Sequence, residues 1–351
     1  MAISDLERLR NIYGSTAASA VLNERFVEVE AGNVPRPATA STPYSGFPTL
    51  LGLPSRPVDW ENPDFGRTQV ALVGVPFDLG VSNRNGARFG PRALRSVERS
   101  GAYNYALDCV PSTVLSAADI GDIPISSRLT LPEAHDAIER HVSAIVDAGV
   151  LPILVGGDHS IDRPILRAIG KDEPVGLIHI DAHCDTSGTK FGHGGPFRQV
   201  VLDGVLDPRR TVQIGIRGAF EYMWEFSYES GMTVIHAEEI DEIGIKAVIE
   251  KARNVVGNGR TYLSFDIDAL DPAFAPGTGT PEIGGLSSRE AQAILRGMKG
   301  VNLVGADLVE VAPQYDATST TVVSASRILF EIFSLFPFSA SLPVRGPHRE
   351  D

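Results

Sequence analysis

Short apolar runs alternate with longer amphipathic stretches along most of this chain. From about residue 67 onward, runs rich in Val, Ile and Leu are separated by segments with helical periodicity. This alternation is typical of repeated β-α-β units, and runs that are apolar almost throughout indicate strands buried on both faces of a sheet. The pattern therefore predicts a single, mainly parallel sheet covered by helices. The predicted strands are residues 69–75, 113–118, 151–155, 175–181, 211–216, 232–235, 261–266 and 303–307.

Three segments have the periodicity of amphipathic helices. The clearest runs over residues 132–148 and is followed by Gly149, a residue that favours the end of a helix. A capping box formed by Ser287 and Glu290 predicts the start of a second helix. A third helix is predicted over residues 320–335, where it would pack against the sheet.

The first sixty residues have a different composition. After a short helical segment at residues 6–13 comes a stretch rich in Pro, Ser and Thr, which disfavours regular secondary structure. We interpret residues 1–60 as an extended arm that wraps the surface or contacts another subunit, with a lid over a functional site as the alternative. Residues 61–351 are then a single α/β domain, because folds of this class reach such lengths as one domain.

The charge balance argues against one class of partner. The 351 residues include 31 Lys and Arg against 44 Asp and Glu, a formal net charge of −13, and contain no basic run that would follow a nucleic-acid backbone. No stretch comes close to the about 20 apolar residues that a membrane span requires, and acidic residues stand where a signal peptide would be apolar. Two cysteines are too few for a disulfide framework. We therefore expect a cytoplasmic protein with no nucleic-acid or membrane partner.

Acidic and imidazole side chains follow one predicted strand at close spacing. After His179, the residues Asp181, His183 and Asp185 stand at alternate positions, so their side chains can project to one side as the backbone leaves the sheet. So much negative charge is costly to gather unless a cation neutralises it, and a divalent metal ion is the simplest candidate. His179 lies deeper in the strand, and we interpret it as a core residue or a support for the ligands.

Two further strand ends carry the same chemistry. Asp266 and Asp268 alternate at the end of one predicted strand, and His159 follows another. Ligands gather at the carboxyl ends of strands in open parallel sheets, so the three segments are expected to meet there. The combined set exceeds what one ion can use, whereas two divalent ions bridged by shared aspartates would use all of it. An oxygen-rich set without thiolate suits manganese and tolerates other first-row metals such as nickel. The expected ligands are His159, Asp181, His183, Asp185, Asp266 and Asp268.

The motifs around these residues resemble those of the ureohydrolase family, which includes arginases, agmatinases and guanidinobutyrases. The matching segments are Gly-Gly-Asp-His-Ser at 156–160, Asp-Ala-His-Cys-Asp at 181–185, Ser-Phe-Asp-Ile-Asp-Ala-Leu-Asp-Pro at 264–272 and Pro-Gly-Thr-Gly-Thr-Pro at 276–281. The resemblance covers about residues 67–336. It implies a three-layer α/β/α, arginase-like fold, a binuclear manganese centre, and release of urea from a guanidino compound.

The resemblance also implies roles for single residues. His193, in a Gly-rich loop, would transfer protons, and Glu310, after the last predicted strand, would hold the guanidinium group, with Asp185 as a further catalytic residue. From the residues alone, His193 would be an ordinary loop histidine, whereas the strand-end position of Glu310 supports a site role independently. The family further implies a homo-oligomer, a trimer or a hexamer. One ion would be held by His159, Asp181, Asp185 and Asp266, and the other by Asp181, His183, Asp266 and Asp268.

The expected reaction is the hydrolysis of a guanidinium carbon by hydroxide formed at two metal ions. Glu310 would align the substrate, and His193 would protonate the departing nitrogen, so that urea leaves with an amine or ammonia. Two alternatives stay open. A single-zinc deacetylase of the related fold would need fewer acids, and a catalytically silent partner subunit would be expected to lack ligands.

The identity of the substrate is less constrained. Substrate tails are read by loops outside the metal motifs, here residues 80–88, 186–195 and 215–228. The aromatic cluster at 220–228 either packs a helix or narrows the pocket. A narrow pocket would favour guanidine, an N-alkylguanidine or 4-guanidinobutyrate, and agmatine is the alternative substrate.

Overall fold

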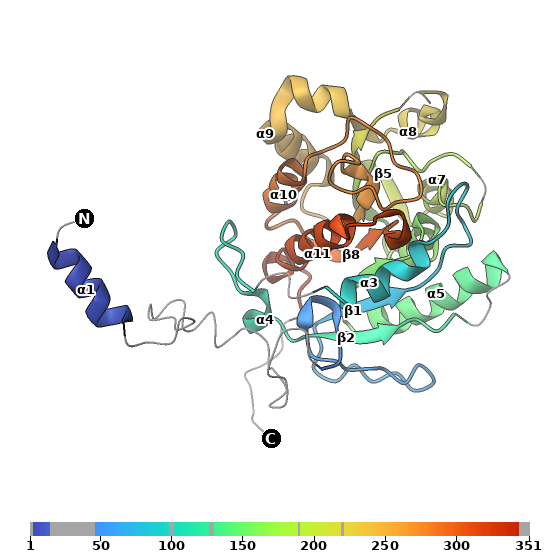
Figure 1. The fold of residues 1–351 in the computed structure, drawn as a ribbon. Coiled ribbons are helices and arrows are strands. Elements are labelled where there is room, and N and C mark those ends of the chain that lie inside the picture. The colour runs from blue at the N-terminus through green and yellow to red at the C-terminus, as the bar shows by residue number, and fades with distance from the viewer. Residues whose placement is uncertain are drawn as a thin grey trace.

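An eight-stranded sheet forms the centre of the computed structural model, which describes residues 3–14, 46–97, 102–125, 130–188, 190–218 and 221–343 (Figure 1). All of its strand pairings are parallel, in the order β2-β1-β3-β8-β7-β4-β5-β6. The prediction of a single parallel sheet is therefore confirmed. The strands are β1 (Val70–Val75), β2 (Ala117–Asp122), β3 (Leu151–Gly156), β4 (Val175–Ile180), β5 (Leu206–Ile216), β6 (Thr233–His236), β7 (Thr261–Asp266) and β8 (Leu303–Val309).

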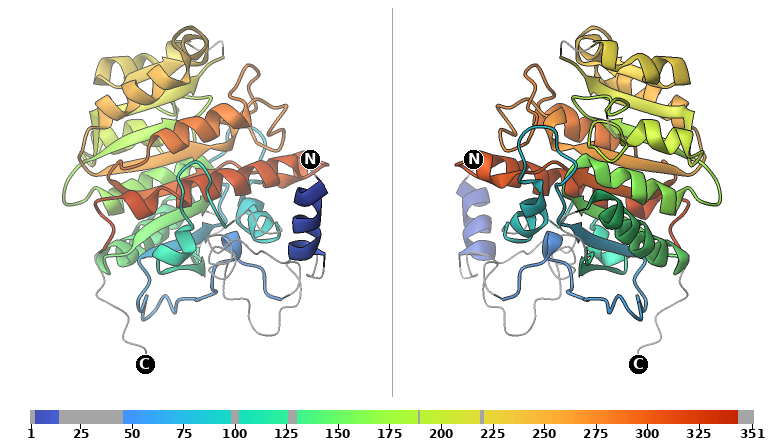
Figure 2. Two further views of the ribbon diagram at one scale, coloured as in Figure 1. Left: turned by 90° about the vertical axis from the view of Figure 1, so that its left-hand side faces the viewer. Right: turned by 90° about the vertical axis from the view of Figure 1, so that its right-hand side faces the viewer.

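Helices cover both faces of this sheet. Strand side chains alternate between two apolar cores, so that Val70 and Leu72 enter one core while Ala71 and Val73 enter the other. The first core is completed by α3, α9, α10 and α11, and the second by α5, α6 and α7, as the two opposite views in Figure 2 show. This is the predicted three-layer α/β/α arrangement. The helices are α1 (Ile3–Tyr13), α3 (Gly90–Arg95), α4 (Pro111–Val114), α5 (Leu131–Asp147), α6 (Asp162–Ile169), α7 (Pro196–Leu202), α8 (Glu225–Ser230), α9 (Ala237–Val256), α10 (Ser288–Gly297) and α11 (Thr320–Phe333).

One predicted strand was wrong. Residues 113–118 were expected to be extended, but Pro111–Val114 form the single turn of α4, where proline suits the first helical position. The strand is Ala117–Asp122. Its Asp119 is buried and accepts a 2.8 Å hydrogen bond from Arg95 Nε. Because a buried acid interrupts the apolar run, the run of apolar residues does not mark this strand.

Most other boundaries agree with the predictions. Residues 261–266 form β7 as predicted, and α5 differs from its predicted range by one residue at each end. The predicted capping box precedes α10, with Ser287 Oγ accepting from Glu290 N. Strand β8 runs two residues further than predicted, to Val309, and so brings Glu310 directly to the strand end.

The N-terminal arm is described only in part. Helix α1 extends the predicted segment 6–13 by three residues, whereas residues 15–45, most of the predicted arm, lie outside the described residues. Leu50 and Leu53, near the end of that arm, are buried in the first core. The division into residues 1–60 and 61–351 stays a prediction.

Helix α11 belongs to a segment that sequence reasoning overlooked as a membrane candidate. By length and composition Thr320–Phe338 could cross a bilayer, and it is the one such segment among the described residues. However, 72% of its most apolar window is buried inside the structure. The segment packs in the first core and is accounted for as a core helix.

Candidate active site

The six predicted metal ligands meet at the carboxyl edge of the sheet. His159 follows β3, while Asp181, His183 and Asp185 follow β4. Asp266 is the last residue of β7, and Asp268 follows it. These strands are close together in the sheet, and β8 lies between β3 and β7. Their ends therefore deliver side chains from distant parts of the sequence to one place, as expected for an open parallel sheet.

The first ligand cluster surrounds His159. Its Nδ1 atom lies 2.9 Å from Asp185 Oδ2, 3.1 Å from Asp181 Oδ2 and 3.3 Å from Asp266 Oδ2. All four residues are buried. Three carboxylate oxygens thus converge on one imidazole nitrogen in a site with little access to water.

The Nε2 atom of His159 carries a proton, as its hydrogen-bond partners show. The Ser264 hydroxyl donates to Asp307 Oδ1 at 2.9 Å, so the same oxygen accepts from His159 Nε2 at 2.8 Å. When the ring is neutral, Nδ1 carries a lone pair directed at three carboxylates, an arrangement that repels unless a metal ion or a second proton supplies positive charge among them. The donor set therefore fits a divalent metal ion. The hydrogen bonds from His159 to Ser264 and from Ser264 to Asp307 orient the imidazole ring.

A second cluster adjoins the first through Asp181. His183 Nδ1 lies 3.1 Å from Asp268 Oδ2 and 3.5 Å from Asp181 Oδ1. Asp181 Oδ2 faces His159, so its two oxygens serve different clusters. His179 donates from Nε2 to Asp181 Oδ2 at 2.7 Å and is a buried support, as the sequence suggested.

Burial and mutual repulsion perturb these acids strongly. Burial, together with the charges of Asp268 and Asp181, raises the pKa of Asp266 well above its usual range. Burial also acts on Asp181, but the neighbouring His179, His159 and His183 hold the pKa of that carboxyl well below its usual range. Such opposite shifts within a few ångströms are typical of sites that bind a cation or perform acid-base chemistry.

Glu310 and His193 form a pair beside the ligand clusters. His193 Nδ1 lies 2.9 Å from Glu310 Oε1, which also accepts from the His159 backbone N–H at 2.9 Å. Glu310 Oε2 is buried and has no hydrogen-bond partner among the described residues, so it is available to a ligand. Glu310 and Asp185 both have positive φ, 61° and 49°, a strained conformation that is enriched at functional sites.

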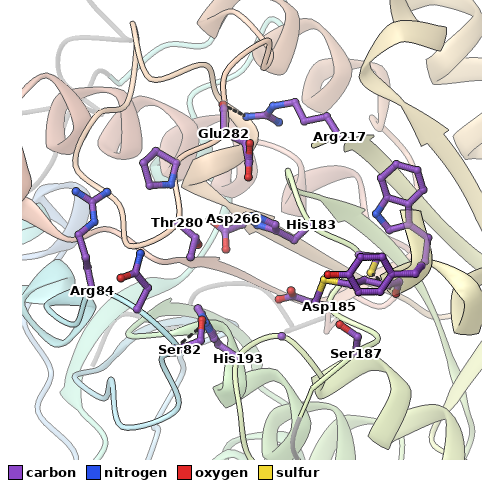
Figure 3. A pocket seen from close by; sticks show the side chains of 17 residues that line it. Ser82, Arg84, His183, Asp185, Ser187, His193, Arg217, Asp266, Thr280 and Glu282 are labelled. Atoms are coloured by element: carbon purple, nitrogen blue, oxygen red, sulfur yellow. Dashed lines mark hydrogen bonds between the residues drawn. The ribbon is translucent and has the colours of Figure 1, made fainter. Parts of the chain in front are cut away.

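A cavity of about 660 Å³ opens in front of these residues. Figure 3 shows Asp185, Asp266 and His183 pointing into it. Of the predicted aromatic cluster, Trp224 lines the cavity and packs on His236, with ring centroids 4.5 Å apart. Phe220 lies outside the described residues.

Several lining residues lie in the loops 80–88 and 215–228 that the sequence singled out for the substrate tail, although it did not name them individually. Arg84 donates to the carbonyls of Thr278 and Gly279 and stacks on Tyr315, while Arg217 donates to several backbone carbonyls around the rim. Ser82 contacts His193 across 111 positions of the sequence. The segment Ser82-Asn83-Arg84 has no characteristic residue spacing in the sequence. Only the folded loops show that it lines the cavity.

The chain is similar to known proteins both as a member of a family and in comparison with single relatives. The model of the arginase family matches residues 68–334. Guanidinopropionase from Pseudomonas aeruginosa is 42% identical over 327 residues, covering 91% of this chain and 98% of that protein. The mitochondrial agmatinase of Gallus gallus is 42% identical over 343 residues, covering 93% and 95% respectively.

A solved structure gives the same result. Proclavaminate amidino hydrolase from Streptomyces clavuligerus superposes with a TM-score of 0.78 at 36% identity, covering 85% of this chain and 100% of that one.

Proposed function

This chain belongs to the arginase family and is a ureohydrolase, and from that premise we propose that it hydrolyses a small guanidino compound at a centre of two divalent metal ions. The observation that carries the proposal is the convergence of three carboxylate oxygens on His159 Nδ1, with a second cluster sharing Asp181. A single-zinc enzyme would not need both clusters, and a silent subunit would not be expected to keep them.

We assign the ligands as the sequence predicted them. One ion would be held by His159, Asp181, Asp185 and Asp266, and the other by Asp181, His183, Asp266 and Asp268. When bound, two such ions supply a water whose pKa is low enough to give hydroxide at neutral pH, the nucleophile that a guanidinium carbon requires. Manganese is the proposed native metal and nickel the alternative, because the set is rich in oxygen and has no thiolate.

The side chains around the clusters would position the substrate and move protons. The free Oε2 of Glu310 would accept from the guanidinium and offset its charge, which fixes the carbon in place. His193, held by Glu310 through Nδ1, would supply the proton that the departing nitrogen needs. Asp185 would act both as a ligand and beside the reacting carbon.

For the substrate, the cavity favours a compact guanidino compound with a short tail. The cavity has a volume of about 660 Å³ and is lined by His183, Asp185 and Asp266 of the ligand clusters, so guanidine alone would leave much of it empty. Arg84 and Arg217 line the cavity and are held by backbone carbonyl oxygens, so their charges remain to attract an anion. Among the candidates, this arrangement favours 4-guanidinobutyrate, then an N-alkylguanidine.

Agmatine is the second candidate, and one residue favours it. Glu282 lines the same cavity, with its backbone carbonyl bonded to Arg217 (Figure 3), and its carboxylate would attract the amine of agmatine. Because the cavity has the two guanidinium groups of Arg84 and Arg217 against the one carboxylate of Glu282, it favours the carboxylate tail of 4-guanidinobutyrate over the amine tail of agmatine.

A urea-release screen tests the proposal directly. The full chain, loaded separately with manganese and with nickel, is given 4-guanidinobutyrate, N-butylguanidine, guanidine and agmatine. We expect urea from at least one compound, with the highest kcat/KM for 4-guanidinobutyrate. Absence of urea from all four would overturn the proposal, and a clear preference for agmatine would replace the substrate.

Two further proposals follow from the family. We propose that the protein is a homo-oligomer, a trimer or a hexamer, which light scattering behind size-exclusion chromatography would measure. We also propose that it works in the cytoplasm, which fractionation of the source cells would test.

A further inference from the structure

Ser82 lies between the imidazole of His193 and the open cavity. Its backbone N–H donates to His193 Nε2 at 3.0 Å, and its hydroxyl oxygen lies 2.8 Å from the same nitrogen. Ser82 is exposed, whereas only 9% of the His193 surface is exposed. Both residues line the cavity, and Figure 3 shows them in contact. The hydroxyl thus connects a buried ring nitrogen with the substrate space.

The two nitrogens of His193 have different tasks. Nδ1 lies 2.9 Å from Glu310 Oε1, and a carboxylate oxygen accepts, so Nδ1 carries a proton. Nε2 is then the atom that gains and loses the second proton. In the neutral ring Nε2 accepts from the Ser82 N–H, and in the charged ring Nε2–H has the Ser82 hydroxyl oxygen as its acceptor.

We propose that the Ser82 hydroxyl relays the proton of His193 to the leaving nitrogen of the substrate, an inference that rests on the proposed hydrolysis. The Nε2–H bond breaks as its proton passes to Oγ, and the Oγ–H bond breaks as that proton passes to the leaving nitrogen. The C–N bond cleaves with its electron pair on the same nitrogen. The hydroxyl ends unchanged, and the neutral imidazole regains its proton from the solvent that Ser82 contacts.

The loop that carries Ser82 is anchored without its hydroxyl. Gly80 N donates to Asp158 Oδ2 at 2.7 Å, His193 N donates to Gly80 O at 2.9 Å, and Gly86 N donates to Asp78 Oδ2 at 2.7 Å. The backbone N–H that faces Nε2 is also independent of the side chain. Ser82→Ala therefore removes the proposed relay while it leaves the loop and the ring in place.

Steady-state kinetics test the relay. We expect Ser82→Ala to lower kcat at least about tenfold, below the full effect of a general acid, with little change in KM, and Ser82→Thr to restore it. Ser96→Ala is the matched control, because the exposed Ser96 hydroxyl bonds to the Arg92 carbonyl outside the cavity. A proton inventory in mixed H2O and D2O should be curved in the wild type and linear in Ser82→Ala. Wild-type kcat and a curved inventory in Ser82→Ala would overturn the inference.

A second measurement needs no substrate. Burial alone lowers the pKa of His193, but the hydrogen bond with Glu310 and its charge raise it to about 9 in the metal-free protein. NMR of the zinc-loaded full chain, which is diamagnetic, gives the exchange rate of the His193 Nε2 proton with solvent. We expect exchange to be at least tenfold slower in Ser82→Ala than in the wild type and in Ser82→Thr. Equal rates would overturn the relay, whereas lack of urea release by the wild type with the expected slowing would overturn the proposed function instead.

Discussion

At the residue scale, Asp181 joins the two ligand clusters. One of its oxygens faces His159 and the other faces His183. A change at this position therefore acts on both clusters, whereas a change at Asp185 or Asp268 acts on one. Asp266 also contacts the first cluster and, by its Oδ1, the backbone N–H of Asp268.

Asp181→Asn should abolish the binding of both ions and the turnover, since a neutral amide removes the charge that both clusters share. Metal content per chain, measured by inductively coupled plasma mass spectrometry, checks this. Asp172→Asn, at an exposed acid, is the control and should keep both ions. Two ions per chain in Asp181→Asn would contradict its role as a bridging ligand.

His193→Ala should lower kcat by roughly 10²-fold or more, the usual scale for a general acid, because the proton donor beside Glu310 is lost. Its metal content should stay unchanged, since His193 contacts Glu310 and Ser82 rather than the ligand clusters. Turnover equal to the wild type would make His193 an ordinary loop residue.

At the element scale, the strands show what the sequence could predict. Strand β7 was predicted to the residue because it is apolar and ends in the acids of the site. Strand β2 was misplaced because its buried Asp119 depends on Arg95, a partner on another element. The candidate ligands were predicted to meet at one edge of the sheet because each follows an apolar strand, and the structure brings them together there. Ser82 and Arg217 lie in loops that the sequence singled out for the substrate tail, but their individual contacts were not predicted because loop contacts leave no periodic trace.

Trp224 stands at the start of α8, and its ring rests on His236 at the end of β6. Its ring packs on His236 and lines the cavity, so Trp224→Ala should relax the preference for 4-guanidinobutyrate over agmatine. Apolar discrimination is typically worth about 1 to 3 kcal/mol, so the ratio of kcat/KM values should shift roughly 10- to 200-fold. Trp60→Ala, at the other tryptophan, should leave the ratio unchanged. If Trp224→Ala also leaves this ratio unchanged, the aromatic segment packs against α8 and does not select the substrate.

At the scale of the whole molecule, the ligand clusters link stability to pH. Without metal, burial and the charge of Asp268 raise the pKa of Asp266, and neighbouring carboxylates outweigh burial to raise the pKa values of His159 and His183. The folded state then holds protons that the unfolded chain releases above about pH 4 for the acid and about pH 6.5 for the histidines. Stability from these groups is therefore lost as pH rises through the folded pKa values.

The melting temperature of the metal-free protein should accordingly fall as pH rises above about 6.5, the ordinary pKa of histidine. Asp181, whose pKa is lowered, acts in the opposite sense only below about pH 4. In the metal-loaded protein the ions replace the protons, so the decline should disappear. Calorimetry between pH 6 and 9, with and without chelator, measures the difference, and parallel curves would contradict the linkage.

Strand order has a consequence for how the chain is made. Among the strands that the structure describes, β8 is the last to be synthesised, yet it alone links the half-sheet β2-β1-β3 to the half-sheet β7-β4-β5-β6. Until residues 303–309 leave the ribosome, the two halves share no strand pairing, and His159 stays apart from the ligands on β4 and β7. A chain that stops short of β8 leaves the edges of β3 and β7 open to other chains. A nascent or truncated chain would therefore be a substrate for chaperones before it could hold its metal.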